Sequence, residues 1–322
     1  MDFAINPDDL KRTQAVLATN GFGEVLHTAA WLIAMCYVGK ASDVELIIDS
    51  LEPPGDIVSD AQILHFLHRF HPINSKLKRQ NKDDPLTTNR TTLTAYSHLD
   101  ELGPPLIREE IRKAFVFACS PVNPSIEGQL HRLLGNIQRN KVLVWVRRGS
   151  KDRRGTSEAS LQQVVEALDA RGLVAVLVGD LRDIKKIPAK AIDLTPVQNT
   201  LYTLKASYVS QGGMLLCAHG MGVFASIGMM SGGMDFGAFL GIPTVNITKY
   251  TPSPTVSQRM RAMAKIAYMK NVGYDEACYD SQSNTPLPQR VIDEAMSYIS
   301  AWHKKSTYLA SWWDPVNNSL FR

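Results

Sequence analysis

Two β-loop-α-β units, about 130 residues apart, constrain the fold of this 322-residue chain more than any other feature of its sequence. Each unit contains an apolar strand, a glycine-containing loop, a helix and a second apolar strand. They occupy residues 13–19, 20–23, 24–38 and 44–49 in the first unit, and 141–146, 147–155, 157–171 and 173–178 in the second. Strands that alternate with helices imply parallel sheets covered by helices. We therefore expect an α/β chain with two Rossmann-like, doubly wound domains.

The segment Pro121-Val-Asn-Pro124 predicts a linker between the two units. We expect an N-terminal domain over residues 1–123 and a C-terminal domain over residues 124–299. The tail from about residue 300 to 322, with its aromatic Trp312 and Trp313, is expected to pack back on the N-terminal domain. Further helices are predicted at residues 59–70, 107–113, 125–138, 197–210, 255–270 and 289–304, further strands at 114–118, 223–229 and 243–248, and a long loop at 74–94.

Composition excludes several classes of protein. An apolar content of 44% with a net charge of +4 excludes disorder, because the chain can bury a sizeable core. The four cysteines lie far apart without a C-x-x-C pair, which excludes a disulfide framework and a zinc ribbon and favours a reducing compartment. With no signal-peptide pattern and no apolar stretch long enough to cross a bilayer, we expect a cytoplasmic protein. The mildly basic balance suits binding of nucleotide diphosphates but does not require nucleic acid.

The first motif with chemical content is Gly21-Phe22-Gly23-Glu24-Val-Leu-His27-Thr28, which joins the first strand to its helix. It lacks the third glycine of a Rossmann fingerprint, since Leu26 stands there. A carboxylate in the first helical turn, at the carboxyl end of a strand, could act as a general base for an acceptor hydroxyl. The alternative is an acid that only complements the helix dipole.

Two further motifs follow strands of the second unit. Residues 147–154 carry five cations in eight positions, a pattern that suits phosphate binding or, alternatively, a solvated surface loop. Residues 230–235, Met-Ser-Gly-Gly-Met-Asp, open a helix, and glycines there let backbone N–H groups approach an anion. The alternative is a tight structural turn.

Together these motifs resemble those of the heptosyltransferase-like, family 9 glycosyltransferases. Residues 21–28 resemble that family's G-x-G-D-V-L-x-T start, and residues 231–245 resemble its D-S-G-P-M-H-L-A-A-A-L-G-I-P-T-V segment. Residues 142–179 look like its strand, G-[ST] loop with a lysine, helix, and strand that ends in glycine. The segment Trp145-Val-Arg-Arg-Gly-Ser150 is similar to the H-x-R-R-x-D loop of α-1,6 and protein O-fucosyltransferases.

The resemblance implies a GT-B fold, with two Rossmann-like domains facing a cleft, and an inverting, metal-independent transfer of a sugar from a nucleotide-diphosphate donor to an acceptor hydroxyl. No cofactor is implied. The family's catalytic aspartate falls on Glu24. Gly21, Phe22, Gly23 and His27 are expected on the acceptor side. The positions expected to bind the donor are Arg147, Arg148, Ser150, Lys151, Arg154, Gly179, Asp180, Asp193, Ser231, Gly232, Gly233, Met234 and Asp235.

The sequence departs from the family pattern in three places. Met230 replaces an aspartate, Asp235 replaces a histidine, and Thr156-Ser157 replaces Trp-Pro. An aspartate beside a diphosphate would repel it unless Asp235 binds a ribose or sugar hydroxyl instead. Two alternatives therefore stay open: a catalytically inactive nucleotide-binding module, and a sugar-nucleotide epimerase of the same fold.

The acceptor stays open as well, as a glycan, a lipid-linked glycan, a small metabolite, a protein or DNA. The basic residues 76–82 keep DNA among these classes. His65, His68 and His71 have a loosely metal-like spacing, but no acid or cysteine completes a ligand set, so we expect no metal site.

Overall fold

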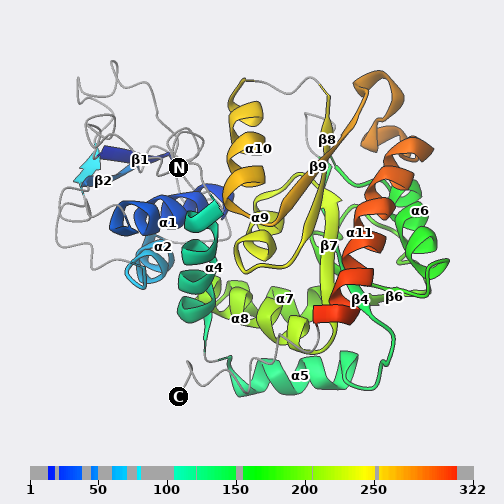
Figure 1. Cartoon of the computed structure of the whole chain (residues 1–322), viewed down its shortest axis with the longest axis horizontal. Helices are drawn as coiled ribbons and strands as arrows, with labels where there is room; N and C mark the ends of the chain where they lie inside the picture. Colours follow the sequence, from blue (N-terminus) through cyan, green and yellow to red (C-terminus); the bar gives the residue numbers. More distant parts are fainter. Residues whose placement is uncertain are drawn as a thin grey trace.

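Two parallel sheets organise the computed structural model of the chain (Figure 1). The structure describes residues 14–18, 22–37, 45–49, 60–70, 78–80, 105–120, 122–149, 155–204, 206–250 and 254–309. The smaller sheet has the strand order β1-β2-β3 and the larger one β6-β5-β4-β7-β8-β9, and every pairing is parallel. The expected α/β class with doubly wound parallel sheets is confirmed.

The larger sheet has the strand order of a Rossmann fold, because the chain builds outward from β4 in one direction and then from β7 in the other. The order therefore reverses between β4 and β7, and in open α/β sheets ligands bind outside the carboxyl ends of the strands at such a reversal. Its strands are β4 (Lys141–Val146), β5 (Val174–Gly179), β6 (Ala191–Asp193), β7 (Val223–Met229), β8 (Thr244–Lys249) and β9 (Met269–Tyr274).

Helices cover both faces of the larger sheet, and the side chains of β4 alternate between the two cores. Val142, Val144 and Val146 pack in the core under α6 (Glu158–Asp169) and α11 (Gln289–Leu309). Leu143 and Trp145 belong to the core on the opposite face. That face is covered by α7 (Thr195–Tyr202), α8 (Ser207–Gly220), α9 (Gly232–Phe239) and α10 (Pro254–Ile266), while α5 (Pro124–Leu134) contacts α7 and α8.

The helices that accompany the smaller sheet share that second core. This part of the chain consists of β1 (Gln14–Ala18), α1 (Phe22–Tyr37), β2 (Glu45–Asp49), α2 (Asp60–Leu67), β3 (Lys78–Gln80) and α4 (Pro105–Cys119). Helix α1 is buried throughout residues 25–35 and contacts α9, whereas α4 contacts α8 and α10 (Figure 1). One continuous hydrophobic core therefore joins the first unit to the second.

Several predicted elements were wrong. The strand predicted at residues 114–118 is the end of α4: Ile111, Phe115 and Cys119 are buried at helical spacing, while Phe117 is exposed. A short apolar run does not distinguish a strand from a buried helix. The loop predicted at residues 74–94 contains β3, which pairs with β2.

Other boundaries also differ from the prediction. The helix predicted at residues 197–210 is two helices, α7 and α8. The short strand β6 and the polar strand β9 were missed, and β9 was partly taken as the end of a helix. Short strands that gain their stability from backbone pairing leave little periodicity in the sequence.

The described end of α11 lies against the larger sheet. The ring of His303 lies 5.1 Å from that of Phe224, and its Nε2 lies 2.7 Å from Asn140 Nδ2. Trp312 and Trp313, on which the predicted packing of the tail depends, lie outside the described residues. Among the helices of the described ranges, none combines the length and apolar character needed to cross a membrane.

Candidate functional site

A cation lies where the strand order of the larger sheet reverses. Arg147 directly follows β4, and its Nη1 donates a hydrogen bond to the carbonyl of Met230, which directly follows β7. The backbone N–H of Thr156 donates to the Arg147 carbonyl at 2.7 Å, and Arg147 N–H donates to Thr156 Oγ1 at 3.0 Å. Thr156, one of the departures from the family pattern, thus closes the base of the basic loop. Arg147 is only partly buried, and a guanidinium carries five N–H donors.

The two glycine motifs meet at this same place. A Cβ atom at Gly232 would lie 2.3 Å from the backbone nitrogen of Gly23 and 2.7 Å from its Cα. A Cβ atom at Gly233 would lie 2.5 Å from the ring of Trp145. The N-termini of α1 and α9 are therefore in direct backbone contact, and the partial positive ends of the two helix dipoles converge. This arrangement favours an anion between the two halves of the chain.

Glu24 lies in the first turn of α1, next to this contact. Its side chain is partly buried, and burial raises the pKa of the carboxyl from 4.5 to about 7, although the positive charge of Arg259 opposes the rise. A carboxyl group that titrates near neutral pH can accept a proton from a substrate and release it again.

A buried polar cluster, formed by His27, Asp235 and Arg259, lies beside Glu24. Asp235 is 2% exposed, and its Oδ2 lies 3.1 Å from His27 Nε2 and 3.1 Å from Arg259 Nε. Arg259 Nη2 donates to the same oxygen. Burial alone would raise the pKa of the Asp235 carboxyl, but Arg259 and His27 hold it below its ordinary value. Burial also lowers the pKa of His27, which keeps the imidazole neutral.

Arg259 was missed by sequence reasoning. It lies on α10, where no motif marks it, and its contact with Asp235 depends on how α9 and α10 pack. Because Arg259 neutralises Asp235, the replacement of histidine by aspartate at this position leaves no uncompensated negative charge beside the site.

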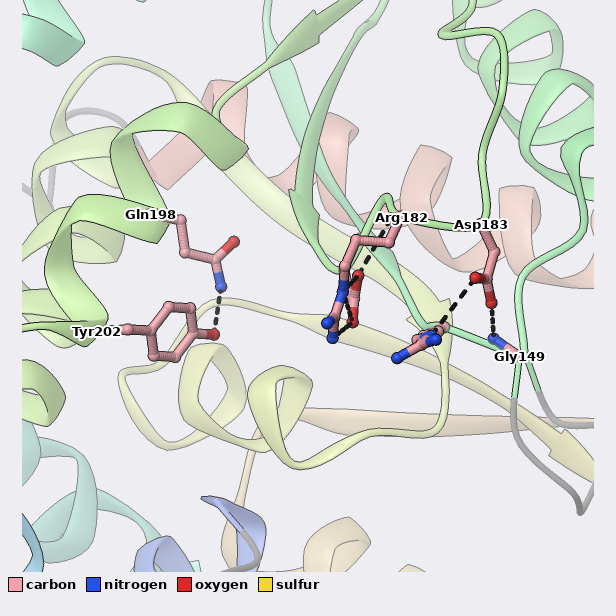
Figure 2. Close-up of polar contacts among 7 residues, drawn as sticks. Gly149, Arg182, Asp183, Gln198 and Tyr202 are labelled. Atoms are coloured by element: carbon pink, nitrogen blue, oxygen red, sulfur yellow. Dashed lines mark hydrogen bonds and ion pairs between the residues drawn. The ribbon is translucent and has the colours of Figure 1, made fainter. Parts of the chain in front are cut away.

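The loops that follow β4 and β5 form a second group of polar contacts (Figure 2). Asp183 accepts a hydrogen bond from Gly149 N–H at 3.0 Å, and its Oδ1 lies 3.4 Å from Arg148 Nε. Arg182 pairs with Asp180. The side chain of Arg148 is 54% exposed, so this predicted donor-binding cation faces solvent and an acidic partner.

Gln198 connects the end of β5 to α7. Its Oε1 accepts from Gly179 N–H at 2.7 Å, and its Nε2 donates to Tyr202 Oη at 3.0 Å (Figure 2). Gly179 has a φ of +107°, and a Cβ there would lie 2.2 Å from the Val146 carbonyl oxygen, so the position requires glycine. Asp193 accepts from the N–H of Thr195 at 2.8 Å at the start of α7. Gly179, Asp180 and Asp193 thus lie at or just beyond the ends of β5 and β6, but their polar groups have partners in the protein.

The remaining predicted site residues are distributed as follows. Phe22 stacks on Tyr208 of α8 with ring centroids 4.7 Å apart, and so lies at the contact between the two halves. Ser231 is the residue that precedes α9, and its side chain makes no capping hydrogen bond. Met234 is fully buried in the shared core, where its side chain cannot reach a ligand. Gly21, Ser150, Lys151 and Arg154 lie outside the described residues.

Within the described ranges, no group of three or more histidine, cysteine, aspartate or glutamate side chains is arranged to hold a metal ion. His65 is partly buried and His68 is exposed, whereas His71 falls outside those ranges.

The chain matches no protein-family model and no curated protein sequence. Solved structures that resemble it include a family 9 glycosyl transferase from Veillonella parvula, with 12% identity and a TM-score of 0.44 over 87% of this chain and 97% of that one. ADP-heptose LPS heptosyltransferase II of E. coli has 11% identity and a TM-score of 0.47 over 92% and 100% of the two chains. A UDP-GlcNAc 2-epimerase from Methanocaldococcus jannaschii has 8% identity and a TM-score of 0.38 over 87% and 76%. These similarities concern the course of the chain and assign no residue and no activity to it.

Proposed function

We propose that this protein is a glycosyltransferase, which moves a sugar from a nucleotide-diphosphate donor to an acceptor hydroxyl without a metal ion and with inversion. Glu24 is the general base. Arg147 and the backbone N–H groups at the start of α9, at Ser231, Gly232 and Gly233, hold the diphosphate.

In this reaction, the Glu24 carboxylate accepts the proton of the acceptor hydroxyl while the hydroxyl oxygen attacks the anomeric carbon of the donor sugar. The bond between that carbon and the β-phosphate oxygen breaks on the opposite side. The nucleoside diphosphate leaves with the electron pair of that bond, and the configuration inverts. Negative charge that develops on the leaving group is stabilised by Arg147 and by the N-terminus of α9, both of which are already in position.

The backbone contact between Gly23 and Gly232 carries this proposal. It brings a carboxyl that titrates near pH 7 next to an anion-favouring helix N-terminus, and that helix follows β7 at the reversal of strand order. A base and an anion site in such proximity suit attack of a hydroxyl with departure of a phosphate. Neither group alone distinguishes transfer from simple nucleotide binding.

A panel of nucleotide sugars, offered without an acceptor, tests the proposal. We expect slow hydrolysis of one donor in the absence of an acceptor. Consumption of that donor should accelerate when the acceptor is supplied. Formation of an epimer would instead identify a sugar-nucleotide epimerase. Tight binding of a nucleotide without turnover of any donor, even in the presence of candidate acceptors, would identify an inactive nucleotide-binding module.

Turnover is expected to survive EDTA, because Arg147 and the start of α9 supply the positive charge that a metal would otherwise bring to the diphosphate. The measurement is the transfer rate with and without chelator, followed by addition of Mg²⁺ or Mn²⁺. Loss of turnover in EDTA that either metal restores would contradict the metal-independent mechanism.

The two neighbouring arginines are expected to differ sharply in donor binding. Arg147→Ala should weaken nucleoside diphosphate binding by roughly 10- to 150-fold, the equivalent of about 1.5–3 kcal/mol for a charged hydrogen bond. Arg148→Ala is the matched control and should change it less than about twofold, because Arg148 is exposed and paired with Asp183. Calorimetry with each nucleoside mono- and diphosphate measures both effects. Unchanged diphosphate binding in Arg147→Ala would mean that the donor does not bind at the end of β4.

A further inference from the structure

Arg259 and Asp235 bring opposite charges to the contact between the N-termini of α1 and α9. A Cβ atom at Gly23, the residue before Glu24, would lie 3.4 Å from Asp235 Oδ2 and 3.6 Å from Arg259 Nη2. Both groups come from the second half of the chain, on α9 and α10, whereas Glu24 belongs to the first half. The charge of the carboxyl therefore depends on a contact between the halves.

The guanidinium is held in place by the carboxylate. Arg259 donates to Asp235 Oδ2 from both Nε and Nη2, and its side chain is only 18% exposed. His27 Nε2 lies 3.1 Å from the same oxygen and 3.2 Å from Met263 Sδ, so the buried imidazole fixes the carboxylate from the α1 side. A cation that is fixed and poorly solvated acts more strongly on a neighbouring carboxyl than an exposed one.

The other elements that pack on α1 bring different groups. In α4, Arg108 binds the carbonyls of Ala264 and Lys265 at the end of α10, and Glu109 pairs with Arg112 and Tyr268. Glu110 and Lys113 pair with each other. Helix α2 contains Asp60 and His65, and β1 has no ionisable residue. Among the described residues, Arg259 is the one whose charge lowers the pKa of Glu24.

We propose that Arg259 and Asp235 are positioning residues for Glu24: Arg259, anchored by Asp235 and His27 across the junction of α1 and α9, sets the charge of the Glu24 carboxyl. This inference rests on the proposed role of Glu24 as general base. It assigns a role to Asp235 other than contact with the donor. It also gives the contact between the two halves a chemical consequence, because separating them removes the cation from the base.

Removing the cation and removing its anchor must shift the titration of Glu24 in the same direction. Arg259→Gln removes a favourable cation, so the midpoint of Glu24 should rise by about one pH unit. Asp235→Asn removes the anchor of that cation, so the midpoint should also rise, but by less. Arg259→Lys keeps the charge and should stay near the wild-type midpoint. Arg261→Gln, an exposed arginine of the same helix, is the matched control and should not move it.

The measurement is a ¹³C NMR titration of the full-length chain with labelled glutamate, in which Glu24→Gln identifies the resonance. A rise in Arg259→Gln that Arg259→Lys does not show, with a smaller rise in Asp235→Asn, supports the proposal. An unchanged midpoint in folded Arg259→Gln, or the same rise in Arg259→Lys, overturns it, because a purely structural role does not depend on the charge. A fall in Asp235→Asn overturns the anchoring role of Asp235. If Asp235→Asn does not fold, the comparison of Arg259→Gln with Arg259→Lys decides.

The titration separates this inference from the proposed function. In a working transferase the acidic limb of kcat should follow the same shifts. If the enzyme is active but the Glu24 midpoint does not change in Arg259→Gln, the positioning role alone is overturned. A rise of the midpoint in Arg259→Gln but not in Arg259→Lys, in a protein that transfers no sugar, overturns the proposed function alone.

Discussion

Glu24→Gln is expected to lower sugar transfer by about 10²–10⁴-fold, the range that a general base contributes. Nucleoside diphosphate binding should stay within about twofold of wild type, because Arg147 and the α9 N-terminus are unchanged. The two measurements are the transfer rate at saturating donor and calorimetry of the diphosphate. Wild-type turnover in Glu24→Gln would show that Glu24 is not the general base.

The same substitution is expected to stabilise the folded protein above pH 7. The pKa of Glu24 is raised from 4.5 in the unfolded chain to about 7 in the folded one, so the folded state binds the proton more tightly. The ionised carboxyl therefore costs stability, which falls as the pH rises from 4.5 to 7 and stays lower above pH 7. Full burial would make this cost about 3 kcal/mol, and partial exposure reduces it to about 1–2 kcal/mol.

Urea unfolding of wild type and Glu24→Gln at pH 4 and pH 8 measures this difference. At pH 4 the two proteins should be equally stable, and at pH 8 the variant should be more stable. If neutralising Glu24 lowers the activity of the protein and raises its stability, the residue is retained for function and not for folding. A variant that is less stable at pH 8 would instead make Glu24 a structural group that complements the dipole of α1.

Strong apolar patterns made the outline of the fold predictable. The buried strand at residues 141–146 and the helix at residues 158–169 that follows the basic loop carry enough periodicity and capping signal to be recognised. The end of α4 was mistaken for a strand because Ala114-Phe-Val-Phe-Ala118 is apolar at every position. Its packing against α8 and α9, which local sequence does not show, favours the helix. Strand β9 is half polar and depends on pairing with β8.

The candidate site was predictable only as separate pieces. Glu24 and Ser231 could each be placed just after a strand, since glycine-rich turns mark both positions. That their helices touch depends on how the two halves pack, which no local spacing encodes. The pairing of Asp235 with Arg259 depends on the same packing, so a carboxylate that reads from sequence as open to a ligand is buried in the structure.

Gly232→Ala is expected to destabilise the protein by about 3 kcal/mol or more, at the upper end of the range for overpacking. The added methyl would lie 2.3 Å from the backbone nitrogen of Gly23, and backbone at two helix N-termini cannot retreat unless the two halves separate. Separation would also expose the His27–Asp235–Arg259 cluster and move Glu24 away from α9, so diphosphate binding should weaken as well. Chemical denaturation and calorimetry measure the two effects.

Gly128→Ala provides the control for Gly232→Ala. Gly128 lies within α5, where an added Cβ meets no atom within 4 Å, so alanine should stabilise the protein by about 0.5–1 kcal/mol through its higher helix propensity. Two glycine-to-alanine changes in one chain should therefore have opposite signs. If Gly232→Ala were as stable as wild type and still bound the diphosphate, the two halves would not be in contact at this point in solution. The base and the anion site would then have to be brought together by the donor itself, which is a different mechanism from a preformed site.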